Sequence, residues 1–394
     1  MRYLETKPPV FTLTAGPVDA YPEVLRALGT TVLYDYDPAF QALFETVTLK
    51  AQKALGCDLP PLILQGEPVL ALEGAAASLI ARDDVVLNLA SGVYGKGFGY
   101  WAARYARKVE EIEVPYDTAI DPDQVRAFLK ENPEVRVVCV CNHDTPSGTL
   151  NDIDAIGAVT AEAGALLIVD AVSSWAGMRT GPTESRAAVY VTGPNKCLGC
   201  PPALSLVAVS QAGWEKIEAN PDAPFASMLS LTDWKNAWKK TEAFPFTPSV
   251  AEINGLDAAL DRYLAEGPEA VWARHALTAR VCREGIKGMG IELWPVTEDI
   301  ASPTATAVRM PEGIDAGPVL AEARARYGVS MSAGRAETLG KLIRIGHMGP
   351  TAQPAYALLA VSALGGALKA LGAKVDVAAG LAAAQAAWDA AIDQ

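Results

Sequence analysis

Short apolar runs alternate with helical patterns between residues 60 and 210, and this alternation restricts the possible folds more than any other feature of the chain. It predicts a mostly parallel sheet with helices on both faces, because a helix must return the chain between neighbouring parallel strands. The predicted strands are residues 62–65, 85–89, 110–114, 136–142, 166–170, 189–192 and 204–210. We therefore expect an α/β protein with a seven-stranded sheet in its large domain.

The pattern changes near residue 250, and this change suggests how the chain divides into domains. A long helix is predicted at residues 250–266, and an alanine-rich helix at 378–391. We place the domain boundary along the first of these helices, without a flexible linker. The predicted parts are an N-terminal segment (1–20), a large cofactor- and substrate-binding domain (21–255) and a small C-terminal α/β domain (256–394).

Composition excludes several kinds of partner. The 394 residues carry a formal net charge of -13, which repels nucleic acid and anionic membranes. Residues 1–9 lack the apolar region of a signal peptide. The longest uncharged stretch, 348–368, contains two prolines and several glycines and predicts a loop and a buried helix instead of a membrane span. We expect a cytoplasmic protein.

The six cysteines do not fit a secreted disulfide framework in a chain of this length. Cys197 and Cys200 match the spacing of a redox or metal motif. A metal site would need a second pair or nearby histidines, and the three histidines lie far apart in the sequence. We interpret these cysteines as small packing residues and predict no metal.

Asp170 and Lys196 are the strongest candidates for a chemical site. Asp170 ends one predicted strand, and Lys196 follows the next strand after a Gly-Pro break. Ligands of open α/β sheets bind beyond the carboxyl ends of the strands, so both side chains should reach one crevice. A carboxylate there can keep a pyridine nitrogen protonated, and a lysine can form an imine with a carbonyl. Alone, either could be a helix cap or a surface charge; together they indicate pyridoxal chemistry.

Two further residues follow predicted strands at the same edge. Tyr94 lies on a predicted flexible loop, where an aromatic ring could stack on a heteroaromatic ring or simply anchor the loop. Thr145, in the segment after the strand at 136–142, offers a hydroxyl group toward a phenolic oxygen, although a capping turn would use the same residue type. Both are candidate contacts of a pyridoxal ring.

Arg335 and Arg344 flank a strand-like segment near the C-terminus. Arg344 interrupts an apolar run, where a charge is costly unless it is paired. A guanidinium group makes two parallel hydrogen bonds to a carboxylate, so the pair predicts a carboxylate substrate. An internal salt bridge is the alternative.

The turn after the first predicted strand is unusual for a phosphate site. In an enzyme with a phosphorylated cofactor, the phosphate belongs on backbone N–H groups at the start of the following helix, which we expect near Leu72. Here Pro68 removes one donor and Glu67 adds a negative charge. Two like charges about 4 Å apart cost roughly 4 kcal/mol at an effective dielectric constant near 20. The turn is predicted to exclude a phosphate and to hydrogen-bond a neutral hydroxyl group through Glu67.

These residues together resemble the fold-type I, class V aminotransferases. The resemblance covers nearly the whole chain and lies in the motifs T-A-G-P at residues 14–17, T-G-P-N-K at 192–196 and R-I-G-H-M-G at 344–349, with Asp170 between them. Residues 66–69 and 93–101 resemble those members that use free pyridoxamine as a substrate with pyruvate and hold no phosphorylated coenzyme permanently. Ordinary members have small residues where this chain has Glu67.

The resemblance implies an amino-group transfer from pyridoxamine to pyruvate that gives pyridoxal and L-alanine. It implies that Lys196 moves the proton of the ketimine between the two substrates and forms an imine with pyridoxal. It also implies that residues 246–248 reach the site of a neighbouring subunit, which predicts a homodimer or homotetramer with the site at the interface. The role of Thr247 without a phosphate stays open.

Three alternatives remain at the level of sequence. The first is a conventional class V aminotransferase of the alanine–glyoxylate or serine–pyruvate type that uses pyridoxal phosphate, with Glu67 turned aside. A class V lyase or desulfurase would need a cysteine on a mobile loop, whereas Cys282 falls in a predicted amphipathic helix. A non-catalytic vitamin B6 carrier would not need Lys196 as a proton shuttle.

Overall fold

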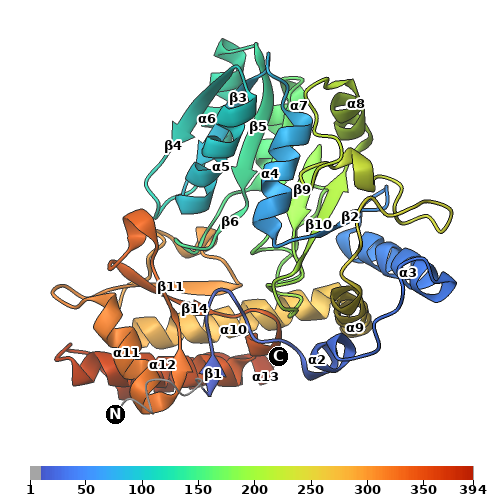
Figure 1. Cartoon of the computed structure of the whole chain (residues 1–394). Coiled ribbons are helices and arrows are strands. Elements are labelled where there is room, and N and C mark those ends of the chain that lie inside the picture. The colour runs from blue at the N-terminus through green and yellow to red at the C-terminus, as the bar shows by residue number, and fades with distance from the viewer. Residues whose placement is uncertain (1–9, 394) are drawn as a thin grey trace.

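The computed structural model describes residues 10–393. Residues 1–9, for which the sequence predicts no signal peptide, lie outside the described part. The chain forms a large domain around one sheet, at the top of Figure 1, and a small domain of packed helices and short strands, at the bottom. The first described strand, β1 (Phe11–Thr12), and the last helix, α13 (Val377–Ile392), both lie with the small domain.

The large domain contains the predicted seven-stranded sheet, in the order β2-β10-β9-β8-β5-β3-β4. Only β10 runs against its neighbours, so the sheet is mostly parallel, as predicted. The strands match the predicted segments to within about two residues at each end, because the buried apolar runs that mark them are local features. Their bounds are β2 Leu62–Gln65, β3 Val85–Ala90, β4 Lys108–Glu113, β5 Val135–Cys141, β8 Leu166–Asp170, β9 Val189–Thr192 and β10 Leu204–Val209.

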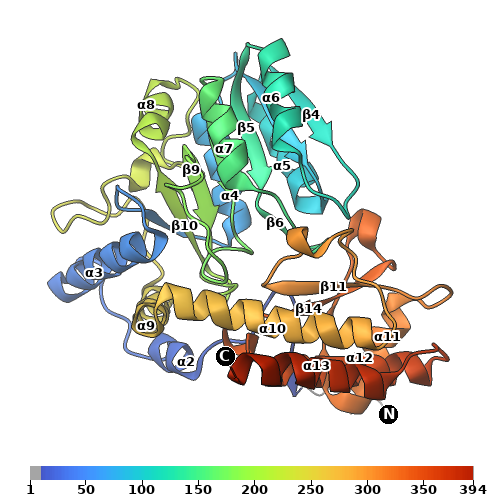
Figure 2. The ribbon, with the colours of Figure 1, turned by 180° about the vertical axis from the view of Figure 1, so that it is seen from behind.

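Helices cover both faces of this sheet. Helices α4 (Pro68–Leu79) and α5 (Val93–Tyr105) pack together on one face, and α6 (Pro122–Glu131) and α7 (Ile153–Glu162) pack together on the other, as the view from behind shows (Figure 2). Helix α8 (Gln211–Ala219) follows β10.

Two sequence predictions about these helices were wrong. Helix α4 begins at Pro68 and not near Leu72, because proline suits a first helical position and Glu67 caps the helix. Tyr94 lies in the first turn of α5 and not on a flexible loop.

The small domain is built on a three-stranded antiparallel sheet in the order β11-β14-β13. The N-terminal strand β1 pairs with β12 in parallel and so joins the start of the chain to this domain. The strands are β1 Phe11–Thr12, β11 Ala305–Arg309, β12 Val329–Ser330, β13 Ser332–Ala333 and β14 Leu342–Gly346. The helices are α10 Pro268–Gly288, α11 Ala316–Tyr327, α12 Pro354–Ala370 and α13 Val377–Ile392, of which the last two confirm the predicted buried and alanine-rich helices.

Helices α2 (Pro22–Leu28) and α3 (Pro38–Leu55) both pack on α9 (Val250–Glu266), below the β2 and β10 side of the large sheet (Figure 1). Helix α9 has the predicted bounds and buries its apolar side in the core of the large sheet. Along α10 the core changes, since Val271 belongs to the core of the large domain and Val281 to that of the small one. The predicted division at residues 255/256 stays a prediction.

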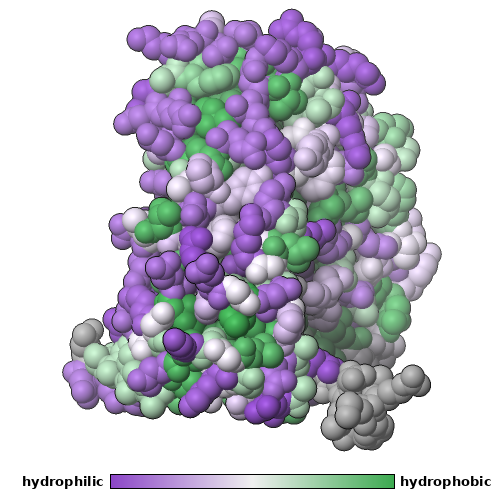
Figure 3. Space-filling model, turned by 90° about the vertical axis from the view of Figure 1, so that its left-hand side faces the viewer, coloured by the Kyte–Doolittle hydropathy of each residue, from purple (hydrophilic) through white to green (hydrophobic). Residues whose placement is uncertain are grey.

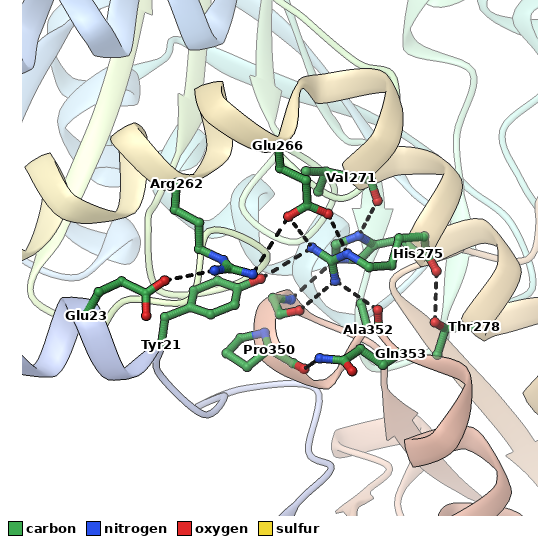
Figure 4. A network of polar contacts seen from close by, with 12 residues as sticks. Tyr21, Glu23, Arg262, Glu266, Val271, His275, Thr278, Pro350, Ala352 and Gln353 are labelled. Carbon is green, nitrogen blue, oxygen red and sulfur yellow. Dashed lines mark hydrogen bonds and ion pairs between the residues drawn. The ribbon is translucent and has the colours of Figure 1, made fainter.

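A polar network fastens this junction (Figure 4). The guanidinium of Arg274 on α10 donates to both carboxylate oxygens of Glu266, to the Tyr21 hydroxyl and to the carbonyl groups of Gly349 and Ala352. The N–H of Tyr21 donates in turn to Gly199, in the turn after Lys196. The network therefore ties the lysine-bearing turn to the segment that follows β14.

The edge strand β4 is charged, with Lys108, Glu110, Glu111 and Glu113 among its residues. Figure 3 shows that hydrophilic side chains prevail on the upper part of this face. Such charges protect an edge strand from pairing with another chain. Within residues 10–393, each helix is too short or too polar to cross a membrane.

Candidate active site

The candidate residues meet at one edge of the large sheet. Glu67, Tyr94 and Thr145 come soon after the carboxyl ends of β2, β3 and β5. Asp170 is the last residue of β8, and Lys196 follows β9. This is the edge at which open α/β sheets bind ligands. Arg335 and Arg344 come from the small domain, so the predicted site lies between the two domains.

Asp170 is a buried carboxylate with few partners. Its Oδ1 accepts the N–H of Val172 at 2.9 Å, and its Oδ2 accepts the Cys141 thiol, with sulfur and oxygen 3.6 Å apart. Cys141 is its register partner on the neighbouring strand β5. Burial raises the pKa of Asp170 to about 6, against the lowering effect of the Val172 and Cys141 hydrogen bonds. A protonated ring nitrogen beside this carboxylate would compensate for its burial.

Lys196 lies under the N-terminal segment. Its Nζ donates to the carbonyl oxygen of Ala15 at 2.7 Å. A Cβ atom at Gly16 would lie only 2.0 Å from Nζ, so a larger residue there would force the lysine side chain to move. Burial, together with the positive charge of Arg344, lowers the pKa of Lys196 to about 8. The amine is therefore much more available as a base than an exposed lysine is.

Tyr94 and Arg335 contact each other across the two domains. The guanidinium carbon of Arg335 lies 5.9 Å from the centre of the Tyr94 ring. Burial raises the pKa of Tyr94, so its hydroxyl stays neutral. Arg335 itself is exposed. Its contact with the substrate, like that of Tyr94, remains a prediction.

Arg344 is half-buried, and its guanidinium group hydrogen-bonds a backbone carbonyl group. Its Nε and Nη2 donate to the carbonyl of Ala333 at 3.0 and 2.7 Å. Within residues 10–393, no acidic group lies within ion-pair distance of its guanidinium. The internal salt bridge considered from the sequence is thus not formed among these residues, and a guanidinium in this state suits a carboxylate ligand.

Thr145 is fully buried and belongs to a polar cluster that joins the domains. Its hydroxyl donates to Ser173 Oγ. The Ser173 carbonyl accepts the Thr304 hydroxyl at 2.8 Å, and His143 Nδ1 lies 2.9 Å from the same Thr304 oxygen. Thr304 directly precedes β11 of the small domain. The predicted contact with a phenolic oxygen would therefore be made by Thr145 and Ser173 together. The sequence predicted only Thr145 for this contact and missed Ser173.

Glu67 caps α4 and occupies the donors that a phosphate would need. Its Oε2 accepts the N–H of Val69 at 3.1 Å, and its carbonyl accepts the N–H of Leu70 at 2.8 Å. Pro68, at the first helical position, has no N–H. The first turn of α4 is thus left with few free donors and one carboxylate.

Comparison with known proteins identifies the family. The model of the family "Aminotransferase class-V" matches residues 100–353, which is more than half of the chain. This chain is a class V aminotransferase. The pyridoxamine–pyruvate transaminase of Mesorhizobium japonicum is 65% identical over 390 residues, which cover 99% of both chains.

Two solved aminotransferase structures agree with the predicted fold type. The crystal structure of pyridoxamine–pyruvate aminotransferase from Mesorhizobium loti superposes with a TM-score of 0.97 at 64% identity, over 98% of this chain and 99% of that one. The ureidoglycine–glyoxylate aminotransferase of Bacillus subtilis superposes with a TM-score of 0.92 at 25% identity, over 98% of this chain and all of that one. The predicted fold-type I architecture is confirmed.

Class V aminotransferases typically depend on pyridoxal phosphate, and the residues of this chain fit only part of that molecule. Asp170 and Lys196 suit its pyridine nitrogen and its aldehyde carbon. The start of α4 does not suit its phosphate, because the cap is a carboxylate that already accepts the N–H of Val69. The described site therefore fits a pyridoxal ring better than it fits a phosphorylated one.

Proposed function

We propose that this aminotransferase transfers the amino group of free pyridoxamine to pyruvate, giving pyridoxal and L-alanine, without a permanently bound coenzyme. The observation that carries the proposal is Glu67 at the cap of α4, where a phosphorylated vitamer would place its dianion. The Mesorhizobium japonicum relative, whose name states this reaction, supports it with 65% identity over nearly the whole chain.

Four residues would hold the vitamin. Asp170 pairs with the ring nitrogen and keeps it protonated, which lets the ring accept electron density during the reaction. Tyr94 stacks on the ring face. Thr145, with Ser173, contacts the phenolic oxygen, and Glu67 accepts a hydrogen bond from the hydroxymethyl group. This last contact is open to a neutral group and closed to a phosphate.

Lys196 would move the proton. Once the amine of pyridoxamine has condensed with the keto group of pyruvate, the neutral Lys196 amine removes a proton from the pyridoxamine methylene carbon. It then delivers the proton to the carbon that becomes the α-carbon of alanine. Arg344, with help from Arg335, binds the pyruvate carboxylate and so holds that carbon within reach of Nζ. After hydrolysis, Lys196 can also hold pyridoxal as an imine.

The direct test is an absorbance assay that follows pyridoxal. Purified protein is mixed with pyridoxamine and pyruvate, and in parallel with pyridoxamine phosphate and pyruvate. Turnover with free pyridoxamine alone supports the proposal. Turnover that requires pyridoxal phosphate, with an amino acid and glyoxylate, would identify a conventional class V aminotransferase and contradict our interpretation of Glu67.

Arg344 provides a test of the keto-acid site. We expect Arg344→Gln to raise KM for pyruvate by about 10²-fold, because two charged hydrogen bonds of roughly 1.5 kcal/mol each are lost. Arg344→Lys keeps the charge without the planar fork and should recover only part of the loss. Steady-state kinetics with pyruvate varied would measure the effect. An unchanged KM for pyruvate in the glutamine variant would refute this role.

The lowered pKa of Lys196 predicts how kcat/KM depends on pH. Its protonated form cannot act as a base, so kcat/KM should rise about tenfold per pH unit on the acid side and level off near the lowered pKa of Lys196, about 8. Because the charge of Arg344 helps to lower this pKa, Arg344→Gln should move the limb to higher pH, whereas Arg344→Lys should not. A limb that stays in place in both variants would belong to a substrate ionisation instead.

We further propose a homodimer or homotetramer in which residues 246–248 of a second copy approach the site. Thr247 is exposed in the single chain, so it is free for such a contact. The cytoplasmic location stays a prediction from the sequence.

A further inference from the structure

Asp144 is a buried carboxylate beside Tyr94, and the proposed mechanism gives Asp144 no role. It ends the short strand β6 (His143–Asp144), which pairs with β7 (Thr149–Leu150), and it is fully buried. Its Oδ2 accepts the N–H of Tyr94 at 2.8 Å and the N–H of Gly95 at 2.9 Å. A single oxygen thus holds two backbone donors in the first turn of α5.

This contact replaces an ordinary helix cap. The position before α5 is Gly92, which has no side chain to bond the first N–H groups. Helices α6 and α7, by contrast, are capped by the adjacent Asp121 and Asp152. Helix α5 is instead capped by Asp144, which lies 50 positions from Tyr94 in the sequence, on the short strand β6. The start of α5 is therefore placed by the segment that follows β5.

The fit around this carboxylate is close. A Cβ atom at Gly92 would lie 2.1 Å from Asp144 Cγ, so any larger residue would displace the carboxylate. A Cβ atom at Gly95 would lie 3.0 Å from the backbone oxygen of Leu89. Glycine at both positions lets α5 approach the strand ends and the carboxylate together.

Capping α5 uses only one of the two carboxylate oxygens of Asp144 and does not by itself require a charged side chain. Its Oδ1 is buried and has no hydrogen-bond partner among the described residues. Burial raises the pKa of Asp144 to about 7, although the N–H groups of Gly95 and Tyr94 lower it. Serine or asparagine could cap a helix without burying a charge. The carboxylate lies within the electrostatic reach of Arg344, which it stabilises in the charged form.

We propose that Asp144 is a positioning residue for the vitamin ring: by holding the backbone of Tyr94, it fixes the Tyr94 ring at the place where it stacks on pyridoxamine. The inference rests on the proposed function only in that Tyr94 contacts the ring. Asp144 itself does not touch the substrate, and its effect on binding passes through Tyr94.

A double-mutant cycle on pyridoxamine binding tests this inference. Calorimetric titration with pyridoxamine alone, without a keto acid, gives Kd for the wild type, Asp144→Ala, Tyr94→Ala and the double variant. We expect each single change to raise Kd about tenfold, and the double variant to bind within about threefold of Tyr94→Ala, because Asp144 has nothing left to position. Effects that multiply in the double variant, or an unchanged Kd in Asp144→Ala, would overturn the inference.

Two further variants separate positioning from folding. Asp144→Asn keeps an oxygen that can accept both N–H groups and should restore Kd to within about threefold of the wild type. Asp152→Ala removes the cap of α7, where Asp152 Oδ1 accepts the N–H of Ala155 at 3.0 Å, and should leave Kd unchanged. If Asp152→Ala weakens binding as much as Asp144→Ala does, the effect is general destabilisation and the inference fails.

The same cycle with pyridoxamine phosphate distinguishes the two proposals. A wild type that binds only the phosphorylated vitamer would refute the proposed function. The coupling between Asp144 and Tyr94 would then be measured from the Kd values for pyridoxamine phosphate, since both vitamers carry the same ring. Absence of coupling with whichever vitamer binds would refute the role of Asp144.

Discussion

Replacing Lys196 with alanine is expected to lower kcat for the conversion of pyridoxamine and pyruvate by at least about 10³-fold, because proton transfer by a positioned base contributes on the order of 10²–10⁴ to the rate and the variant also loses its imine-forming amine. Pyridoxamine should still bind, since Asp170, Tyr94 and Glu67 would hold it without Lys196. Single-turnover absorbance for the rate and calorimetric titration for Kd measure the two quantities separately.

The side chain of Lys196 also contacts the N-terminal segment, so a structural effect has to be separated from the chemical one. Its Nζ donates to Ala15, and the cavity left by alanine lies beside Gly16. Adding a small primary amine such as ethylamine should restore part of the rate if only the proton carrier is missing. Lys374→Ala, at an exposed lysine, serves as the control and should turn over normally. Near-normal turnover of Lys196→Ala would remove Lys196 from the mechanism.

Replacing Glu67 with serine is expected to let phosphorylated vitamers bind. A carboxylate about 4 Å from a phosphate charge costs roughly 4 kcal/mol at an effective dielectric constant near 20, which corresponds to about 10³ in affinity. Glu67 is exposed in the single chain, so solvent screening should reduce the gain to about 10². Serine would also free the N–H of Val69 as a phosphate donor. Calorimetric titration with pyridoxamine phosphate measures the change.

Glu67→Gln separates charge from shape. It keeps an acceptor for the N–H of Val69 and for the hydroxymethyl group of pyridoxamine, but it has no charge. We expect it to bind pyridoxamine almost as well as the wild type, whereas Glu67→Ser should bind it about tenfold more weakly through the lost hydrogen bond. Phosphorylated vitamer should bind the glutamine variant more tightly than the wild type. If neither variant gains affinity for pyridoxamine phosphate, another part of the site excludes the phosphate.

The start of α4 is marked by a local sequence signal. Glu67 followed by Pro68 is a cap and a first helical position, and that pairing is readable from sequence. Treating the two residues as a turn placed the helix start four residues too late. The chemical conclusion did not depend on this error, because the charge of Glu67 and the missing N–H of Pro68 oppose a phosphate in either case.

Tyr94 could not have been placed by the same reasoning. The segment before α5 ends in Gly92, and the glycines that follow Tyr94 favour a loop when only neighbours in the sequence are considered. The helix forms because Asp144, 50 residues further along the chain, supplies the missing cap. A contact over that distance leaves no mark on the local pattern.

The amino-acid sequence by itself determined the strands of the large sheet and pointed to the candidate residues that follow them, because buried apolar runs and their polar ends are local features. It also carries the prediction that the start of α4 excludes a phosphate, since that prediction depends on the adjacent residues Glu67 and Pro68. Only the tertiary structure decided that β10 runs antiparallel, that Ala15 holds Lys196 and that no acidic group within residues 10–393 forms an ion pair with Arg344. These features arise from contacts between distant segments, and it is burial by those segments that lowers the pKa of Lys196 and makes it available as a base.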